Sequence, residues 1–196
     1  MNILFLGPDK NPVLTYLQQT EDRVLQSEDI VSSNMIGNGE VFLVSYGYRH
    51  IITPDVLEAV GHRSVNLHIS LLPYNRGADP NFWSFVEDSP KGVTIHRIDK
   101  GLDTGPVFIQ KEISFSDENT LRTTYARLHE EIQQLFISHW MDIRNGILHP
   151  KPQPAGGSYH RSSQKQQLID DIAKVYLDWE ITKLKRYIHT KMNRVS

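Results

Sequence analysis

The sequence contains no cysteine. A disulfide framework, a thiolate nucleophile and a cysteine-ligated metal site are therefore excluded. No apolar run approaches the roughly 20 residues of a membrane-spanning helix. The opening MNILFLGPDKNP breaks at Gly7-Pro8 before the core of a signal peptide could form. These absences predict a cytoplasmic protein that does not enter a membrane.

The chain also lacks an excess of charge of either sign. It has 21 Lys and Arg against 23 Asp and Glu, for a formal net charge of −2. Such a balance gives no general attraction to nucleic acid or to acidic lipid. With 196 residues and 39% hydrophobic residues, the chain suits one principal domain with an appended tail. We expect that domain at residues 1–150, and a linker with a helical C-terminal tail at residues 151–196.

Short apolar runs alternate with helical patterns along the first part of the chain. We expect strands at residues 2–6, 40–45, 65–68, 92–98 and 106–115. We expect helices at residues 12–19, 56–60, 80–86 and about 121–143, the last ended by Gly146. This alternation predicts an α/β fold with a mainly parallel sheet, in which the last two strands lie side by side at one edge. Residues 150–163 are rich in Pro, Gly and Ser, which is typical of a linker.

Several catalytic and cofactor motifs are missing. The first loop, GPDKNP, lacks the G-x-G-x-x-G that a dinucleotide requires, so a dehydrogenase is not expected. Ser70 does not lie in the G-x-S-x-G turn of a serine hydrolase. His62, His68 and His96 do not have the spacing of zinc ligands, so we expect no metal.

Polar side chains follow the expected strands at the edge where open α/β sheets bind their ligands. Asn66 and His68, in VNLHISLLPYNRG, are two residues apart and point the same way on a strand. Asp103 lies in the turn DKGLDTG. An amide can stabilise an oxyanion, an imidazole can accept a proton from an amine, and a carboxylate can orient the imidazole or relay a proton. Together they suit acyl transfer, although each alone is more often a structural residue.

Two motifs in this order, NLHISLLPYNRG and GVTIHRIDKGLDTGPVFIQKEI, resemble those of the formyltransferases that use 10-formyltetrahydrofolate. The resemblance covers most of residues 1–150. It implies a Rossmann-like, open, mainly parallel twisted sheet with helices on both faces, followed by the short helical tail. It implies 10-formyltetrahydrofolate as co-substrate and Asn66, His68 and Asp103 as the catalytic residues. It also implies that two loops receive the pterin ring through Arg49, His50, Ile51, Ile52, Ile98, Asp99 and Leu102.

The resemblance leaves the amine acceptor open. The first loop lacks the glycines and serines typical of glycinamide ribonucleotide transformylases. The C-terminal barrel of methionyl-tRNA formyltransferases is not expected after Ser196, nor the N-terminal domain of formyltetrahydrofolate hydrolases. The sugar N-formyltransferases, which act on nucleotide-linked deoxyamino sugars for bacterial surface polysaccharides, are the best match.

On this interpretation Arg76, Asp79 and Phe82 would contact the nucleotide sugar, although Phe82 and Trp83 would equally suit simple helix packing. The expected partners are small molecules, not nucleic acid or membrane. The tail would also suit a homodimer contact. Three alternatives stay open at this point: another amine (methionyl-tRNA or glycinamide ribonucleotide), hydrolysis of the formyl donor, and a nucleotide-binding subunit without catalysis.

Overall fold

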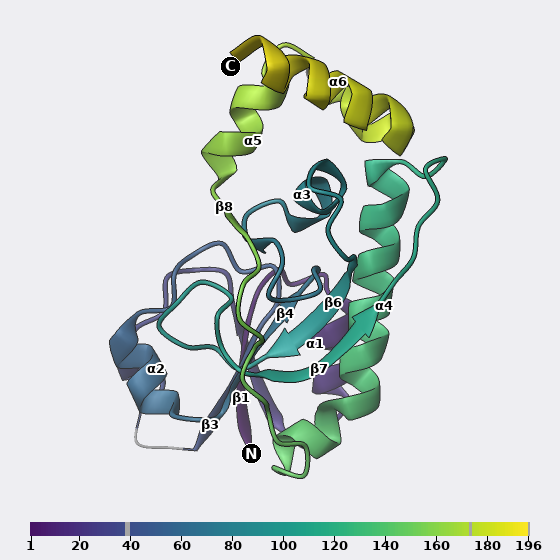
Figure 1. The fold of residues 1–196 in the computed structure, drawn as a ribbon. Helices are drawn as coiled ribbons and strands as arrows, with labels where there is room; N and C mark the ends of the chain where they lie inside the picture. Colours follow the sequence, from purple (N-terminus) through teal and green to yellow (C-terminus); the bar gives the residue numbers. More distant parts are fainter. Residues whose placement is uncertain (38–39, 173, 196) are drawn as a thin grey trace. The chain divides into compact units, whose positions relative to one another are not determined.

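The computed structural model describes residues 1–37, 40–172 and 174–195. The chain divides into two compact units (Figure 1). The first comprises Met1–His68, Thr94–Gln110 and Ile132–Gln153, and the second comprises Ile69–Val93, Lys111–Glu131 and Pro154–Ser196. Each unit is described by itself.

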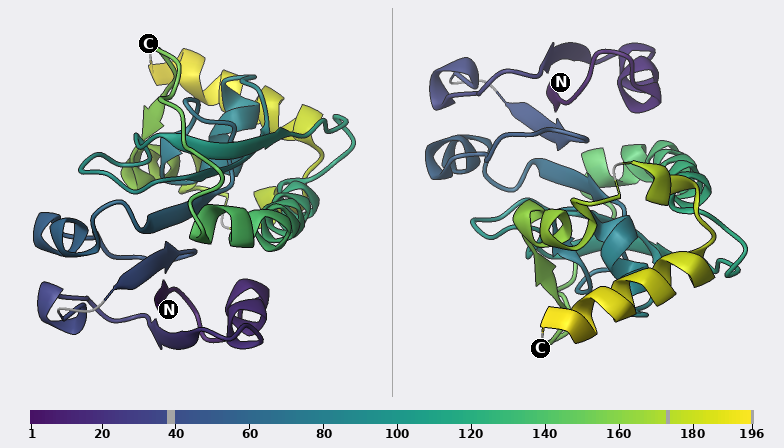
Figure 2. Two further views of the ribbon diagram at one scale, coloured as in Figure 1. Left: turned by 90° about the horizontal axis from the view of Figure 1, so that it is seen from below. Right: turned by 90° about the horizontal axis from the view of Figure 1, so that it is seen from above.

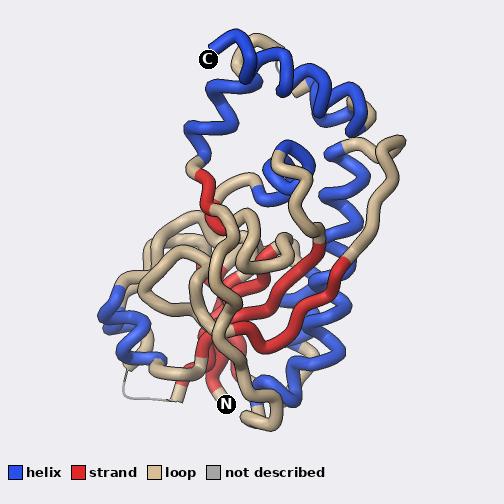
Figure 3. Tube along the Cα trace, viewed as in Figure 1, coloured by secondary structure: helices blue, strands red, loops and turns tan. Residues whose placement is uncertain are grey.

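The first unit is built on a mainly parallel sheet with strand order β2-β1-β3-β4-β6-β7. The strands are the red segments of the tube in Figure 3. β1 (Asn2–Leu6) pairs in parallel with β2 (Arg23–Ser27) and with β3 (Val41–Ser45), and β3 pairs in parallel with β4 (Ser64–His68). β6 (Gly92–His96) runs antiparallel to β4, and β7 (Val107–Glu112) lies beside β6 at the edge. The predicted α/β class is confirmed.

Helices cover both faces of this sheet, α2 (Pro54–Val60) one face and α1 (Pro12–Gln18) the other (Figures 1 and 2). The cause is the alternation of side chains along a strand. Leu4, Leu6 and Leu43 share one apolar cluster with Val56 and Val60 of α2. Phe42, next to Leu43 and so on the opposite face, lies edge-on to Trp140 with ring centroids 5.0 Å apart. Trp140 belongs to α4 (Leu121–Arg144).

One strand of the six-stranded sheet was not expected from the sequence. β2 reads RVLQS and is half exposed along its length, because it forms the edge of the sheet. An edge strand needs no continuous apolar run, so its pattern gives a weak signal. The short 3-10 helix η1 (Ser33–Met35) was also not expected.

The second unit is mostly helical. It contains α3 (Pro80–Val86), α5 (Ser162–Ile169), the 3-10 helix η2 (Val175–Asp178), α6 (Ile181–Val195) and the first part of α4. Its core is an apolar cluster that includes Phe82, Trp83, Phe85, Leu121, Ile181, Leu184 and Ile188.

Residues 154–163, most of the stretch expected to be a linker, belong to this second unit. β8 (Tyr159–His160) pairs in parallel with β5 (Arg76–Gly77). The Arg76 amide donates to the carbonyl of Ser158 at 3.0 Å, and the Ala78 amide donates to that of His160 at 2.9 Å. The predicted domain boundary at residue 150 stays a prediction. Within the described part of the chain, no helix has both the length and the apolar composition needed to cross a bilayer.

Candidate active site

Three of the predicted site residues lie together in the first unit. Asn66 and His68 project from the same face of β4, opposite His96 and Thr94 of β6. Asn66 Nδ2 donates a hydrogen bond to Asp103 Oδ1 at 3.2 Å. His68 Nδ1 lies 3.5 Å from Asp103 Oδ2. The carboxylate therefore contacts both the amide and the imidazole, an arrangement that suits acyl transfer.

Asp103 is held in a tight turn between β6 and β7. Its φ of 54° is left-handed, a conformation that aspartate tolerates better than most residues. The turn is built partly by Asp99, whose Oδ1 accepts from the Gly101 amide at 3.1 Å and from Thr104 Oγ1 at 2.6 Å. The Asp103 side chain is only 13% exposed, so water screens its charge weakly.

A fourth side chain, His96, completes the cluster and was not predicted as part of it. His96 Nε2 lies 3.2 Å from Asn66 Nδ2 and 3.4 Å from Asp103 Oδ1, and the residue is 2% exposed. From the sequence, His96 stood out only as one of three histidines that lack the spacing of zinc ligands. Its position opposite Asn66 depends on the β4–β6 register, which the sequence does not encode locally.

The hydrogen bonds of His96 determine how the Asn66 amide is oriented. His96 Nδ1 lies 2.7 Å from the carbonyl of Arg97, which can only accept, so Nδ1 carries a proton. In the neutral ring Nε2 is then an acceptor. Asn66 has an acceptor on either side, His96 Nε2 and Asp103 Oδ1, and must turn its NH₂ group toward both. The donor end of the amide is thus fixed within the cluster.

Two loops of the first unit carry the residues predicted to receive the pterin ring. Ile52 and Ile98, one from each loop, pack against the same apolar cluster as Leu6 and Val56. Ile51 and Leu102 are 72% and 49% exposed. Arg49, His50 and Asp99 are exposed as well. Exposed apolar side chains next to turns with accessible backbone groups are suited to binding a flat heterocycle. The roles of these seven residues stay predictions.

The residues predicted to bind the nucleotide sugar belong to the second unit. Asp79, at the start of α3, accepts from Lys165 Nζ at 2.5 Å. Burial lowers the pKa of Lys165, but the hydrogen bond and charge of Asp79 outweigh burial and raise it overall. Phe82 is 2% exposed and lies edge-on to Trp83, whereas Arg76 is half-buried in β5. The part of Arg76, Asp79 and Phe82 in substrate binding stays a prediction.

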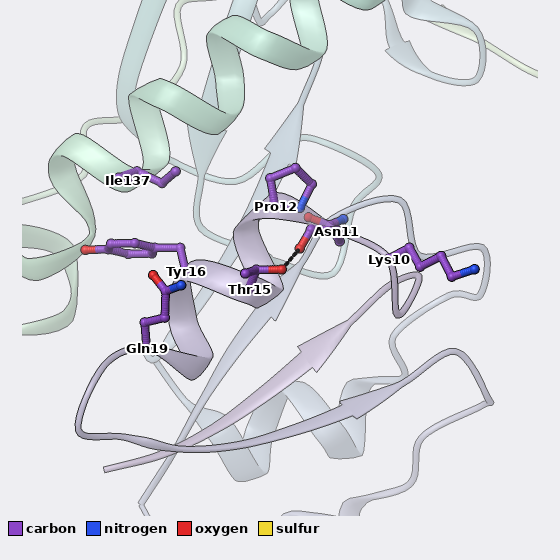
Figure 4. Close-up of a pocket in the computed structure, with 7 residues that line it drawn as sticks. All are labelled: Lys10, Asn11, Pro12, Thr15, Tyr16, Gln19 and Ile137. Atoms are coloured by element: carbon purple, nitrogen blue, oxygen red, sulfur yellow. Dashed lines mark hydrogen bonds between the residues drawn. The ribbon is translucent and has the colours of Figure 1, made fainter.

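A separate hollow of about 640 Å³ lies beside the first loop of the first unit (Figure 4). It is lined by Lys10, Asn11, Pro12, Thr15, Tyr16, Gln19 and Ile137. The Asn11 side chain accepts from the Val13 amide at 2.9 Å and caps α1. The polar group there serves the fold, so we place no chemistry in this hollow. Over the described ranges, no group of three or more His, Cys, Asp or Glu could hold a metal ion.

Sequence comparison connects this geometry with known proteins. A family model described as Formyl transferase matches residues 9–139. The methionyl-tRNA formyltransferase of Thermodesulfovibrio yellowstonii is 40% identical over 119 residues, which are 60% of this chain and 39% of that protein. The dTDP-4-amino-4,6-dideoxyglucose formyltransferase of Mycobacterium bovis is 35% identical over 108 residues, 55% of this chain and 46% of that protein. The chain thus spans less than half the length of these curated relatives.

One solved structure matches this chain over nearly the whole length of both proteins. It is the formyltransferase PseJ from Anoxybacillus kamchatkensis in complex with UDP-4,6-dideoxy-4-formamido-L-AltNAc and tetrahydrofolate. It is 47% identical, with a TM-score of 0.87, and the match covers 94% of this chain and 97% of that one. With the family model matching two thirds of the sequence, the chain belongs to the formyl transferase family.

Proposed function

We propose that the protein is an N-formyltransferase that moves the formyl group of 10-formyltetrahydrofolate to the primary amine of a nucleotide-linked deoxyamino sugar. The observation that carries the proposal is the contact of Asp103 with both Asn66 and His68. The similarity to PseJ, whose structure holds a UDP-formamido sugar and tetrahydrofolate, supports this donor and this class of acceptor. A cytoplasmic location, and use of the product in a bacterial surface polysaccharide, belong to the same proposal.

In the first step the acceptor must present a neutral amine, because an ammonium has no lone pair. As the neutral amine attacks, its nitrogen becomes positively charged and gives up one proton, which His68 accepts. The amine nitrogen bonds to the formyl carbon, and the electrons of the carbonyl double bond move to its oxygen. Asn66 Nδ2–H and the protonated His68 stabilise the resulting oxyanion. One of the two Asn66 hydrogens turns from its partner in the cluster to the oxyanion.

In the second step the bond between the formyl carbon and the folate nitrogen breaks. The oxyanion returns its electrons to re-form the carbonyl, and the departing nitrogen takes up a proton relayed through Asp103. The proton lost by the amine therefore ends on tetrahydrofolate, and the acceptor becomes a formamide. Asp103 suits this relay because it lies within 3.5 Å of His68 Nδ1.

Methionyl-tRNA is the second candidate acceptor. The 40% identity with a methionyl-tRNA formyltransferase over 119 residues favours it. Hydrolysis of the donor would need the same cluster with water in place of the amine. A homodimer formed through the tail stays a prediction, which the molar mass in light scattering would check.

The acceptor is identified by incubating the protein with 10-formyltetrahydrofolate and one amine at a time. The panel contains the 4-amino precursor of the PseJ formamido sugar, dTDP-4-amino-4,6-dideoxyglucose, glycinamide ribonucleotide and methionyl-tRNA. We expect tetrahydrofolate release with an aminosugar nucleotide. Release only with methionyl-tRNA, or formate release without any amine, would contradict the proposal.

The same assay tests the assignment of His68. We expect His68→Ala to lower kcat by about a hundredfold or more, because it removes both the base and an oxyanion donor. His62→Ala is the matched control, since His62 is exposed and outside the cluster, and should keep full activity. A near-normal rate of folded His68→Ala would overturn the mechanism.

A further inference from the structure

The position of Asp103 depends on the backbone of its turn. Residues other than glycine pay a conformational cost in the left-handed region, on the order of 1 kcal/mol, and stay there only when their surroundings hold them. Asp99 holds the turn from within, through Gly101 and Thr104. Those bonds come before and after Asp103 in the chain but do not reach its own carbonyl. The carbonyl of Asp103 is hydrogen-bonded by a group outside the turn.

Gln153 supplies this contact from a distant part of the sequence. Its Nε2 donates one hydrogen to the carbonyl of Asp103 and the other to the carbonyl of Gly105, both at 2.8 Å. Gly105 is closely packed, because a Cβ there would lie 1.9 Å from the carbonyl oxygen of Arg97. Gln153 thus joins the carbonyl of Asp103 to a closely packed point of the turn.

The backbone around Gln153 is anchored as well. Lys151, two residues earlier, exchanges two hydrogen bonds with Val107: the Val107 amide donates to Lys151 at 2.7 Å and the Lys151 amide donates to Val107 at 2.8 Å. This antiparallel bridge fixes the segment against the start of β7. The backbone next to Gln153 is therefore held in place by β7, although Gln153 lies in the stretch whose composition is typical of a linker.

We propose that Gln153 is a positioning residue that holds the Asp103 carboxylate against Asn66 and His68 through the backbone of the turn. The proposal rests on the catalytic role proposed for Asp103. The two carbonyl oxygens need two hydrogens, and the amide nitrogen of Gln153 provides both from one atom. A carboxylate would repel both oxygens, and an asparagine would be one methylene too short.

The test is a double-mutant cycle between Gln153 and Asp103. Gln153→Met keeps the length of the side chain and removes both donors, and Gln153→Asn keeps the donors but shortens their reach. We expect either change to lower kcat by about tenfold or more, at saturating donor, with little change in the KM of the acceptor, because misplaced catalytic groups slow the chemical step. In the Asp103→Asn background, which we expect to be at least a hundredfold slower, Gln153→Met should cost no further activity.

The acceptor in this cycle is the aminosugar nucleotide that is active in the panel, with product measured by mass spectrometry. Rates are compared at temperatures at which thermal unfolding shows every variant to be folded. Gln18→Ala, on the exposed side of α1, is the control and should keep the wild-type kcat. The proposal would be overturned if Gln153→Met lowered kcat by the same factor in the wild-type and Asp103→Asn backgrounds. It would also be overturned if Gln153→Met left kcat of the wild-type protein unchanged. Full activity of Asp103→Asn would instead overturn the assignment of Asp103 itself.

Discussion

His96 helps to orient the side-chain amide of Asn66. This buried histidine therefore has a part in the cluster without itself contacting the substrate. Nδ1 of the ring donates to the carbonyl of Arg97, so in the neutral ring Nε2 accepts from Asn66. Without His96 the amide keeps only one of its two acceptors, Asp103 Oδ1, and its NH₂ group is held less firmly. The oxyanion would then meet a less well oriented donor.

This predicts a difference between two substitutions of His96. Gln places an oxygen near the position of Nε2, whereas Phe fills the space with no acceptor. We expect His96→Phe to lower kcat by about tenfold or more, since the loss of one oxyanion donor costs about 10²–10³ and the amide is only misoriented here. His96→Gln should retain clearly more activity. The measurement is kcat for the two folded variants, and equal kcat values would contradict this role of His96.

At the scale of elements, the loop after β4 is organised by the strand pair β5–β8 of the second unit. Gly157 has a φ of 87°, and a Cβ there would lie 2.0 Å from the carbonyl oxygen of Pro73. Ser158 is next in the chain. Its Oγ accepts a hydrogen bond from the backbone amide of Asn75 at 3.0 Å and donates one to Glu87 Oε2 at 2.7 Å. Residues 157–160 therefore close over the Pro73–Gly77 stretch with no room for a side chain at Gly157.

Adjacent glycines allow this close approach to be tested. Gly156 also has a left-handed φ, of 91°, but a Cβ there would meet nothing within 4 Å. We expect Gly156→Ala to lower the free energy of unfolding by about 1 kcal/mol, the cost of the backbone conformation alone. Gly157→Ala should cost about 1–3 kcal/mol more, because backbone must shift to admit the methyl group. Urea denaturation measures both, and equal losses would show that the contact with Pro73 is easily relieved.

At the scale of the whole molecule, an ion pair connects positions 122 residues apart in the first unit. Arg144, at the end of α4, donates through Nε to Asp22 Oδ2 at 2.7 Å and through Nη2 to Asp22 Oδ1 at 2.5 Å. The Asp22 side chain is 1% exposed. The hydrogen bond from Arg144 holds the pKa of Asp22 below its usual range, against the opposing effect of burial.

The lowered pKa predicts how stability depends on pH. A carboxyl group with a lowered folded-state pKa stabilises the fold above its unfolded-state pKa of about 4 and loses this contribution as the pH falls through the folded-state value. We expect Asp22→Asn to lower the free energy of unfolding at pH 7 by about 1.5–3 kcal/mol. The difference from wild type should shrink progressively below about pH 4.

Denaturant titrations between pH 7 and pH 2.5 check this prediction. Glu58→Gln, which removes an exposed carboxylate in α2, is the control and should change stability little at any pH. A difference between Asp22→Asn and wild type that stays constant down to pH 2.5 would contradict the linkage.

Most elements of the fold could be predicted from local patterns. Continuous apolar runs indicated the buried strands β1, β3 and β4, and Pro80 with its following residues indicated α3 over the same residues as observed. The edge strand β2 was missed because half of its side chains are exposed. The pairing of β8 with β5 was missed because it depends on backbone groups brought together by folding, in a stretch of Pro, Gly and Ser that carries no strand pattern.

The candidate site, like the fold, could be predicted from the sequence only in part. The spacing of Asn66 and His68 in one strand determined that both face the same side, and the turn sequence determined a tight loop at Asp103, because side-chain alternation and turn chemistry act between near neighbours. Only the tertiary structure decided that His96 orients Asn66 and that Gln153 holds the carbonyl of Asp103. Those contacts span 30 and 50 residues, and a hydrogen bond at that separation exists only after strand register and backbone packing have brought its two groups together.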